Sequence, residues 1–158
     1  MQLPFPSPLV SDDLIDYGTI VPLLTDANMV VVDTSIVLAV LLNEPSRAGI
    51  LKRTKGMRVL VAPSISWEVG NALVALVRRG RADHAAIARA WASFERIPLR
   101  FTVCDVAASL RLATERKLYA YDAYVIEAAR AAGAALMTLD HRQRLAAIAC
   151  GVQIQEVS

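Results

Sequence analysis

The chain has 158 residues, of which 55% are apolar and 20% charged, and its formal net charge is +2 at pH 7. This length and apolar content predict one globular unit with a buried core. No window reaches the roughly 18 uncharged apolar residues that a membrane span requires, and no Lys or Arg precedes an apolar stretch at the N-terminus as in a secretory signal. We therefore expect a cytoplasmic protein that does not associate with a membrane.

Charge is unevenly distributed along the chain. Residues 1–28 contain four Asp and no Lys or Arg, which gives them a charge of −4. All 17 basic residues and the other 11 acidic residues follow, so the rest of the chain carries +6. A basic body is compatible with a polyanionic partner, and the run "RRGR" (Arg78, Arg79, Arg81) adds to this, although a solvated helix end explains that run equally well.

Residues 1–28 are predicted to be an N-terminal extension of unknown role. Four prolines exclude a long helix there, and the segment shows no clear hydrophobic periodicity. Met29 opens the first convincing strand and would also serve as an alternative start. We therefore divide the chain into an extension, residues 1–28, and a main domain, residues 29–158.

From Met29 onward, short runs rich in β-branched residues alternate with helical segments. In chain order we predict a strand at 30–32, helices at 34–42 and 46–55, a strand at 58–62, helices at 64–79 and 82–96, a strand at 98–103, helices at 105–117 and 121–132, a strand at 134–139, a helix at 141–149 and a strand at 152–157. This alternation predicts an α/β fold of three layers, in which a mostly parallel central sheet is covered by helices on both faces.

Acidic residues occur where the predicted strands pass into helices. Asp33 follows the first strand, Asp122 stands at the start of the helix at 121–132, and Asp140 ends "AALMTLD". In folds of this class, strand carboxyl ends and helix N-termini converge on the edge of the sheet where ligands bind. Glu68 lies in the first turn or so of its helix, at the border of the apolar face. We therefore expect four carboxylates to meet at one edge.

Each of these carboxylates also has an ordinary structural explanation. Asp is a preferred helix N-cap, worth about 1 kcal/mol, and a first-turn Glu favours the helix dipole. Several converging carboxylates without adjacent Lys or Arg repel one another, however, and a hard divalent cation relieves that repulsion. All-oxygen ligation favours Mg²⁺ or Mn²⁺ over zinc, because His84 and His141 have no partner at ligand spacing. We interpret Asp33 as a metal ligand as well as a helix cap.

Three segments resemble, in order, the motifs of the PIN domain, specifically of the VapC-type toxin ribonucleases of bacterial toxin–antitoxin pairs. They are "VVVDTSIVLAVLLNEP", "APSISWEVGNAL" and "LYAYDAYVIEAARAAGAALMTLDHRQR". Within them Glu68 follows Asp33 by 35 residues, Asp122 follows after 54 more, and Asp140 after a further 18. The resemblance extends from Met29 to about Val157.

This resemblance implies that the four carboxylates form a catalytic cluster that binds one or two Mg²⁺ or Mn²⁺ ions. It also implies that Ser35 and Thr138 assist by hydrogen bonding to ligands or metal waters. The implied activity is a metal-dependent endoribonuclease that hydrolyses RNA to a 5′-phosphate and a 3′-hydroxyl. Arg142 and Arg144, just after the last acid, are candidates for holding the RNA backbone.

The same resemblance implies two protein partners. One is a cognate antitoxin whose segment covers or enters the acidic site, and the other is a second copy of the toxin in a homodimer. We expect dimerisation through the helical region after Pro63. The aromatic residues that would anchor an interface, or else belong to the core or a groove wall, are Trp67, Trp91, Tyr119, Tyr121 and Tyr124.

Other phosphate-handling classes match the sequence less well. A haloacid-dehalogenase-like phosphatase requires a second Asp two residues after the first, where this chain has Ser35. The paired acid and late Lys of a response-regulator receiver are missing, as is a GxxxxGK[ST] phosphate loop. The remaining alternative is a PIN-like module that binds RNA or a protein partner without cleavage.

Overall fold

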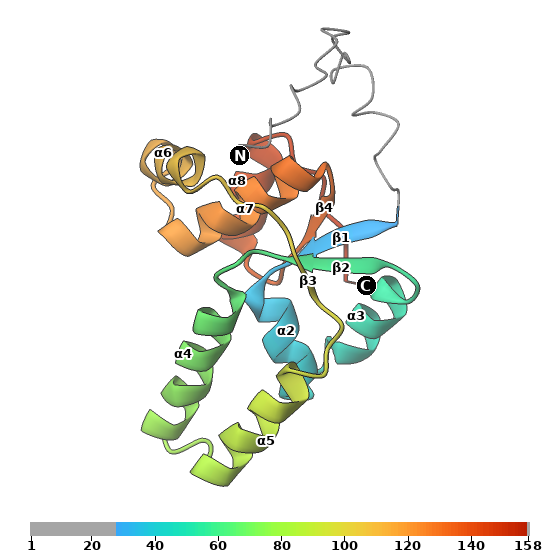
Figure 1. Ribbon diagram of the computed structural model, residues 1–158, viewed down its shortest axis with the longest axis vertical. Coiled ribbons are helices and arrows are strands. Elements are labelled where there is room, and N and C mark those ends of the chain that lie inside the picture. The colour runs from blue at the N-terminus through green and yellow to red at the C-terminus, as the bar shows by residue number, and fades with distance from the viewer. Residues whose placement is uncertain (1–27, 158) are drawn as a thin grey trace, which may run out of the picture.

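A computed structural model describes residues 28–157 of the chain (Figure 1). Its elements in order are β1 (Met29–Val32), α2 (Thr34–Leu41), α3 (Arg47–Thr54), β2 (Arg58–Val61), α4 (Ile65–Arg78), α5 (His84–Phe94), β3 (Arg100–Phe101), α6 (Val106–Arg116), α7 (Ala120–Ala132), β4 (Ala135–Met137) and α8 (His141–Ala149). The proposed extension lies outside the described residues, apart from Asn28.

The four strands form one parallel sheet in the order β3-β2-β1-β4. Strand β1 lies at the centre, where Val31 pairs with Leu60 of β2 and with Leu136 of β4. Because all strands run in the same direction, their carboxyl ends open on one edge. The α/β architecture expected from the sequence is confirmed.

Helices cover both faces of the sheet, as the continuous apolar sequence of β1 predicts. Successive side chains of a strand point to opposite faces, so Val31 packs with α6, α7 and α8, whereas Val30 and Val32 pack with α2, α3, α4 and α5. Figure 1 shows these groups of helices on either side of the sheet. The protein thus has two apolar cores separated by one sheet.

Three predicted strands are clearly shorter in the structure, and the one expected at 134–139 covers only Ala135–Met137. The strand expected at 98–103 is reduced to Arg100–Phe101, because it pairs only with β2 at the edge of the sheet and Pro98 has no N–H to donate. The strand expected at 152–157 is a single bridge between Ile154 and Leu136. Only Leu136 of β4 exchanges backbone hydrogen bonds with that segment, which is too little to extend the sheet.

Across residues 28–157, none of the helices has both the length and the apolar character needed to cross a membrane. The longest apolar stretch, from Met29 into α2, is divided between a strand and a helix by Asp33.

Two glycines make a matched test of the packing. A Cβ on Gly49 in α3 would lie 2.5 Å from the backbone oxygen of Val157, whereas a Cβ on Gly70 in α4 meets nothing within 4 Å. Both substitutions gain the same helix propensity. Gly49→Ala is therefore expected to be about 1–3 kcal/mol less stable than Gly70→Ala in urea unfolding, since its new methyl group is overpacked. Equal stabilities would show that the C-terminal segment does not pack on α3 as described.

Candidate active site

Asp33 leaves β1 and caps α2 at the edge where the strands end. Its backbone N–H donates to the carbonyl of Met137, the last residue of β4, at 3.0 Å, which ties the ends of the two strands together. Its carboxylate accepts the backbone N–H of Ser35 at 3.0 Å, so the side chain is a true N-cap. The side chain is nevertheless only 7% exposed, although a cap normally faces water.

Side chains from the loop after β4 and from α8 supply the other hydrogen bonds of Asp33. The hydroxyl of Thr138 donates to Oδ2 at 3.2 Å, and the amide of Gln143 donates to Oδ1 at 3.4 Å. These donors are neutral, and none of the ion pairs formed among residues 28–157 involves Asp33. The charge of this buried carboxylate is therefore stabilised by dipoles alone.

Glu68 is held by two hydroxyl groups on different elements. Ser64 donates to Oε1 at 2.6 Å and Thr34 donates to Oε2 at 2.9 Å. Ser64 precedes α4, but its side chain forms no capping bond because it is committed to Glu68. Thr34, which directly follows Asp33, thereby connects the second acid to the end of β1.

Asp140 is connected to Asp33 through one shared residue. Thr138 donates its hydroxyl to Asp33 and accepts the backbone N–H of Asp140 at 3.0 Å with the same oxygen. The carboxylate of Asp140 caps α8 by accepting the backbone N–H groups of Arg142 at 2.7 Å and Gln143 at 3.0 Å. Nearby, the side-chain oxygen of Ser35 accepts the backbone N–H of Leu139 at 3.0 Å. This bond and the bond from Thr138 to Asp33 both join the start of α2 to the loop after β4.

Asp122, in the first turn of α7, shows that the four acids share one electrostatic environment. Burial, and after it the negative charges of Asp140, Asp33 and Glu68, raise the pKa of its carboxyl to about 6, against a backbone hydrogen bond with Tyr119 that lowers it. Elements far apart in the sequence therefore bring all four predicted acids into electrostatic contact, without a compensating Lys or Arg among the described residues.

The carboxylates do not form a closed ligand set as they stand. Within residues 28–157, no group of three or more His, Cys, Asp or Glu side chains is placed so that it would hold one metal ion. The donor chemistry still fits a hard divalent cation, because every side chain is an oxygen donor and their charges are uncompensated. Metal binding would have to draw the carboxylates closer together than they lie here.

Gln143 provides a second observation that fits a polar ligand at this edge. The side chain is fully buried, its amide nitrogen donates to Asp33, and its Oε1 has no hydrogen-bond partner among the described residues. A buried acceptor without a partner costs about 1–3 kcal/mol. The sequence prediction missed Gln143, Thr34 and Ser64, and only their positions beside the motif acids would have indicated them.

The two candidate RNA-binding arginines differ in the structure. Arg142 is exposed at the start of α8. The guanidinium of Arg144 binds the carboxylate of Glu156 through two contacts, one of them 2.7 Å between Nη1 and Oε2. A phosphate would have to displace Glu156 to reach Arg144, so Arg142 is the more available cation.

The aromatic residues divide into exposed and packed groups. Tyr119, the N-cap of α7, is 77% exposed. Trp67, which directly precedes Glu68 in α4, is 67% exposed. Tyr121 also reaches solvent and contacts Tyr124 edge-on, with ring centroids 5.8 Å apart. Trp91 is half-buried and packs against Phe94.

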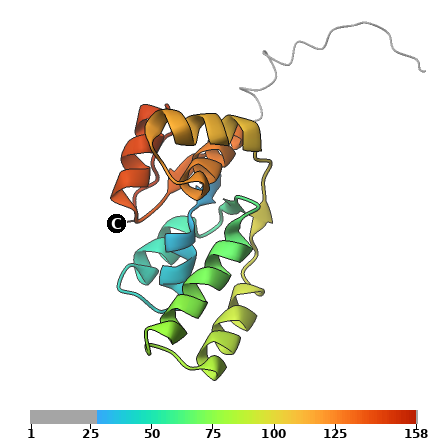
Figure 2. The same ribbon diagram turned by 90° about the vertical axis from the view of Figure 1, so that its left-hand side faces the viewer.

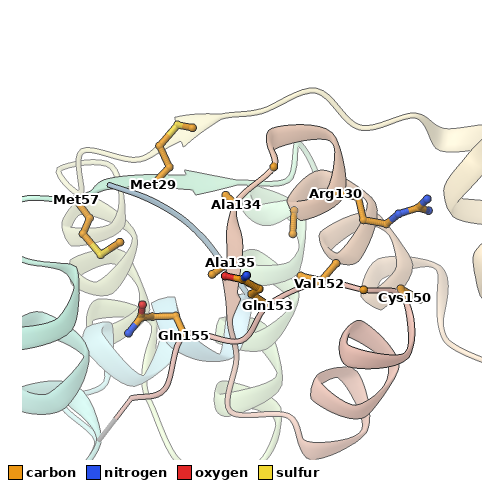
Figure 3. A pocket seen from close by; sticks show the side chains of 12 residues that line it. Met29, Met57, Arg130, Ala134, Ala135, Cys150, Val152, Gln153 and Gln155 are labelled. Carbon is orange, nitrogen blue, oxygen red and sulfur yellow. The ribbon is translucent and has the colours of Figure 1, made fainter. Parts of the chain in front are cut away.

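A hollow of about 670 Å³ lies at the opposite edge of the sheet (Figure 3). Met29 at the start of β1, Met57 before β2 and Ala135 at the start of β4 line it. None of the four acids reaches this hollow. The acidic edge and the hollow therefore lie at opposite ends of the strands.

The raised pKa of Asp122 predicts a pH-dependent gain in stability for Asp122→Asn. The folded protein keeps this proton up to about pH 6, whereas an ordinary Asp with a pKa of 3.8 loses it earlier, so folding loses stability as the pH rises between these values. In EDTA, the Tm of Asp122→Asn is expected to exceed that of the wild type at pH 8 and to match it at pH 4. Asp105→Asn, which retains the cap of α6, is the control. A difference that does not change with pH would contradict the shared negative field.

The double role of Thr138 predicts a loss of stability on Thr138→Val. This variant keeps the shape of the side chain but leaves Asp33 with one donor fewer and the N–H of Asp140 without its acceptor. We expect a cost of about 1–3 kcal/mol in chemical denaturation. In the control Thr114→Val, only bonds to the carbonyls of the same helix are lost, so its stability should change little. Similar effects in both variants would contradict the linking role of Thr138.

Comparisons with known proteins agree with this architecture. Among curated proteins, no significant sequence match was found. A crystal structure of PAE2754 from Pyrobaculum aerophilum superposes with a TM-score of 0.60 and 26% sequence identity, over 76% of this chain and 80% of that one. The family model for the PIN domain matches residues 30–149, which include all four acids. The chain therefore belongs to the PIN-domain family.

Proposed function

We propose that this protein is a Mg²⁺- or Mn²⁺-dependent endoribonuclease and the toxin of a VapC-type toxin–antitoxin pair. PIN domains are generally nucleases, and the family model spans the whole acidic edge. The observation that carries the proposal is the environment of Asp122, whose pKa is raised by burial and by the charges of three other carboxylates. A catalytic metal centre concentrates negative charge in this way before the metal binds.

In this proposal, Asp33, Glu68, Asp122 and Asp140 hold the cation. When bound, the cation would acidify water and offset the negative charge that develops on the scissile phosphate. Thr138, Ser64 and Thr34 keep the carboxylates oriented toward the edge of the sheet through the hydrogen bonds described above. Arg142 supplies a positive charge beside Asp140 for the RNA backbone.

The products follow from hydrolysis of the phosphodiester. Water adds to phosphorus, the bond from phosphorus to the 3′-oxygen breaks, and the leaving oxygen takes a proton. One product ends in a 5′-phosphate and the other in a 3′-hydroxyl. Asp122 and Asp140 are both candidates to orient the water, since each carboxylate lies at the edge.

The proposal includes two partners and a location. An antitoxin would cover or enter the acidic edge, where the exposed Tyr119, Tyr121 and Leu139 offer apolar contacts beside the acids. The toxin would form a homodimer and act in the cytoplasm, where its RNA substrates are.

One observation favours a second candidate function, a PIN-like module that binds RNA or a protein partner without cleaving. The described carboxylates do not form a ready-made ligand set. Asp33 and Asp140 cap α2 and α8 in the structure. In a binding module, this capping would be their only role. The two candidates differ in their response to divalent metal.

The direct test is cleavage of a mixed cellular RNA pool by the purified protein in Mg²⁺ or Mn²⁺ and in EDTA. We expect cleavage only with metal, and at least a hundredfold loss in Asp122→Asn, because one ligand of the cation is weakened. The control is Asp83→Asn, at the N-cap of α5 and away from the four acids. Asn is also a preferred N-cap, so this variant should cleave like the wild type. RNA that is bound but left whole at every metal concentration would favour the binding module instead.

A further inference from the structure

Helix α4 carries an exposed stripe that runs from the acidic edge to the far end of the helix. Its members, Trp67, Asn71, Val74 and Arg78, follow one another at intervals of four, three and four residues, so they lie along one side of the helix. All four are exposed, and Val74 is 50% exposed despite being apolar. Figure 2 shows α4 extending away from the sheet beside α5.

The near end of the stripe is fixed beside the acids. Trp67 directly precedes Glu68, whose two carboxylate oxygens are bound by Ser64 and Thr34. The first turn of α4 is therefore held firmly to the end of β1. The exposed indole is presented at the border of the acidic edge, and no acidic residue other than Glu68 occurs in α4.

The far end of the stripe is strongly basic. Arg78, Arg79 and Arg81 lie at the turn between α4 and α5, and all three are exposed. The ion pairs among residues 28–157 are those of Arg130 with Glu127 and of Arg144 with Glu156, so none involves this arginine turn. Ten residues separate Glu68 from Arg78, a rise of about 15 Å along the helix.

We propose that the stripe and the arginine turn form a track for single-stranded RNA. The inference rests on the proposed function and deepens it by naming the path that the RNA strand takes across the protein surface. Trp67 stacks on an unpaired base beside the scissile phosphate, and the arginine turn neutralises phosphates about 15 Å farther along the strand. A base within a duplex does not offer its face to an indole, which is why the track selects single strands.

The charges favour RNA over a second copy of the chain as the occupant. Two copies that met with their arginine turns together would repel each other, because Glu68, the one acidic residue of α4, lies at the opposite end of the helix and Asp83, the N-cap of α5, is a single acid against three arginines. A strand of phosphates offers complementary charge along its whole length. An exposed Trp followed by a cluster of Arg is the combination expected for sequence-tolerant binding of single strands.

The test measures binding by fluorescence anisotropy in EDTA, so that the RNA is not cut. The probes are a fluorescein-labelled single-stranded RNA of randomised sequence, about 20 nucleotides long, and a labelled RNA duplex of the same length, both titrated at several salt concentrations. The variants are Trp67→Ala, the triple variant Arg78→Gln, Arg79→Gln, Arg81→Gln, and the same three positions changed to Lys. The controls are Leu110→Ala on α6 and the triple variant Arg47→Gln, Lys52→Gln, Lys55→Gln on α3, which are exposed away from α4.

Each variant has its own expected signature. The triple Gln variant should reduce the slope of log affinity against log salt by about 2, since each single-strand phosphate contact contributes about 0.7. The triple Lys variant should keep the slope. Trp67→Ala should lose about tenfold in affinity without a change of slope, and should bind single-stranded RNA no better than a duplex. Both controls should bind like the wild type.

Several results would overturn the track. If the wild type cleaves and binds RNA, and the α4 variants bind it with unchanged affinity, the track is rejected and the proposed function stands. An equal loss of slope in the α3 control would show that only net charge matters. If Trp67→Ala turned a dimer into a monomer in sedimentation without affecting RNA affinity, the stripe would be an interface between copies. A wild type that bound no RNA would reject the proposed function and the track together.

Discussion

Repulsion among four carboxylates is the constraint on which the rest of the site depends. They lie at one end of a parallel sheet, close enough for three of them to raise the pKa of the fourth, Asp122. Such an arrangement is costly unless the fold supplies donors, and here the donors are neutral. Thr138, Gln143, Ser64 and Thr34 direct their hydrogens at Asp33 and Glu68. The remaining charge is left for a ligand to neutralise.

The parallel sheet explains why these donors are available. Carboxyl ends of β1 and β4 are adjacent because the strands pair side by side, and the bond from the N–H of Asp33 to Met137 fixes their offset. β1 passes directly into α2, and β4 reaches α8 through a short loop. The first N–H groups of each helix need an acceptor, which Asp33 and Asp140 provide. One carboxylate thus caps a helix and contributes to the acidic edge at the same time.

Much of this arrangement was predictable from local sequence patterns. The β-branched run before Asp33 and the alternation of strands and helices indicate the order of elements, and an Asp between a strand and a helix is a preferred N-cap. The family motifs indicated four acids, which the fold brings into one electrostatic environment. The lengths of the strands at the edges of the sheet were predicted poorly. Pro98 shortens β3, and the C-terminal segment makes only one bridge to β4.

The supporting residues were harder to foresee because they act across the fold. Thr34 bonds to an acid 34 residues away, and Gln143 to one 110 residues away, so no local pattern reports either contact. Gln143 reads in the sequence as an ordinary polar residue of a helix, yet it is fully buried beside Asp33. Buried polar groups of this kind are specified by the tertiary structure and by the ligand that the site is arranged to receive.

Isothermal titration with Mn²⁺ shows whether the four carboxylates form one metal site. The metal-free wild type should show saturable binding that is greatly weakened both in Asp33→Asn and in Asp122→Asn, although these residues lie on different elements. Asp105→Asn should bind as the wild type does. Absence of saturable binding in the wild type, or binding that survives both substitutions, would contradict a shared metal site and leave Asp33 and Asp140 as helix caps.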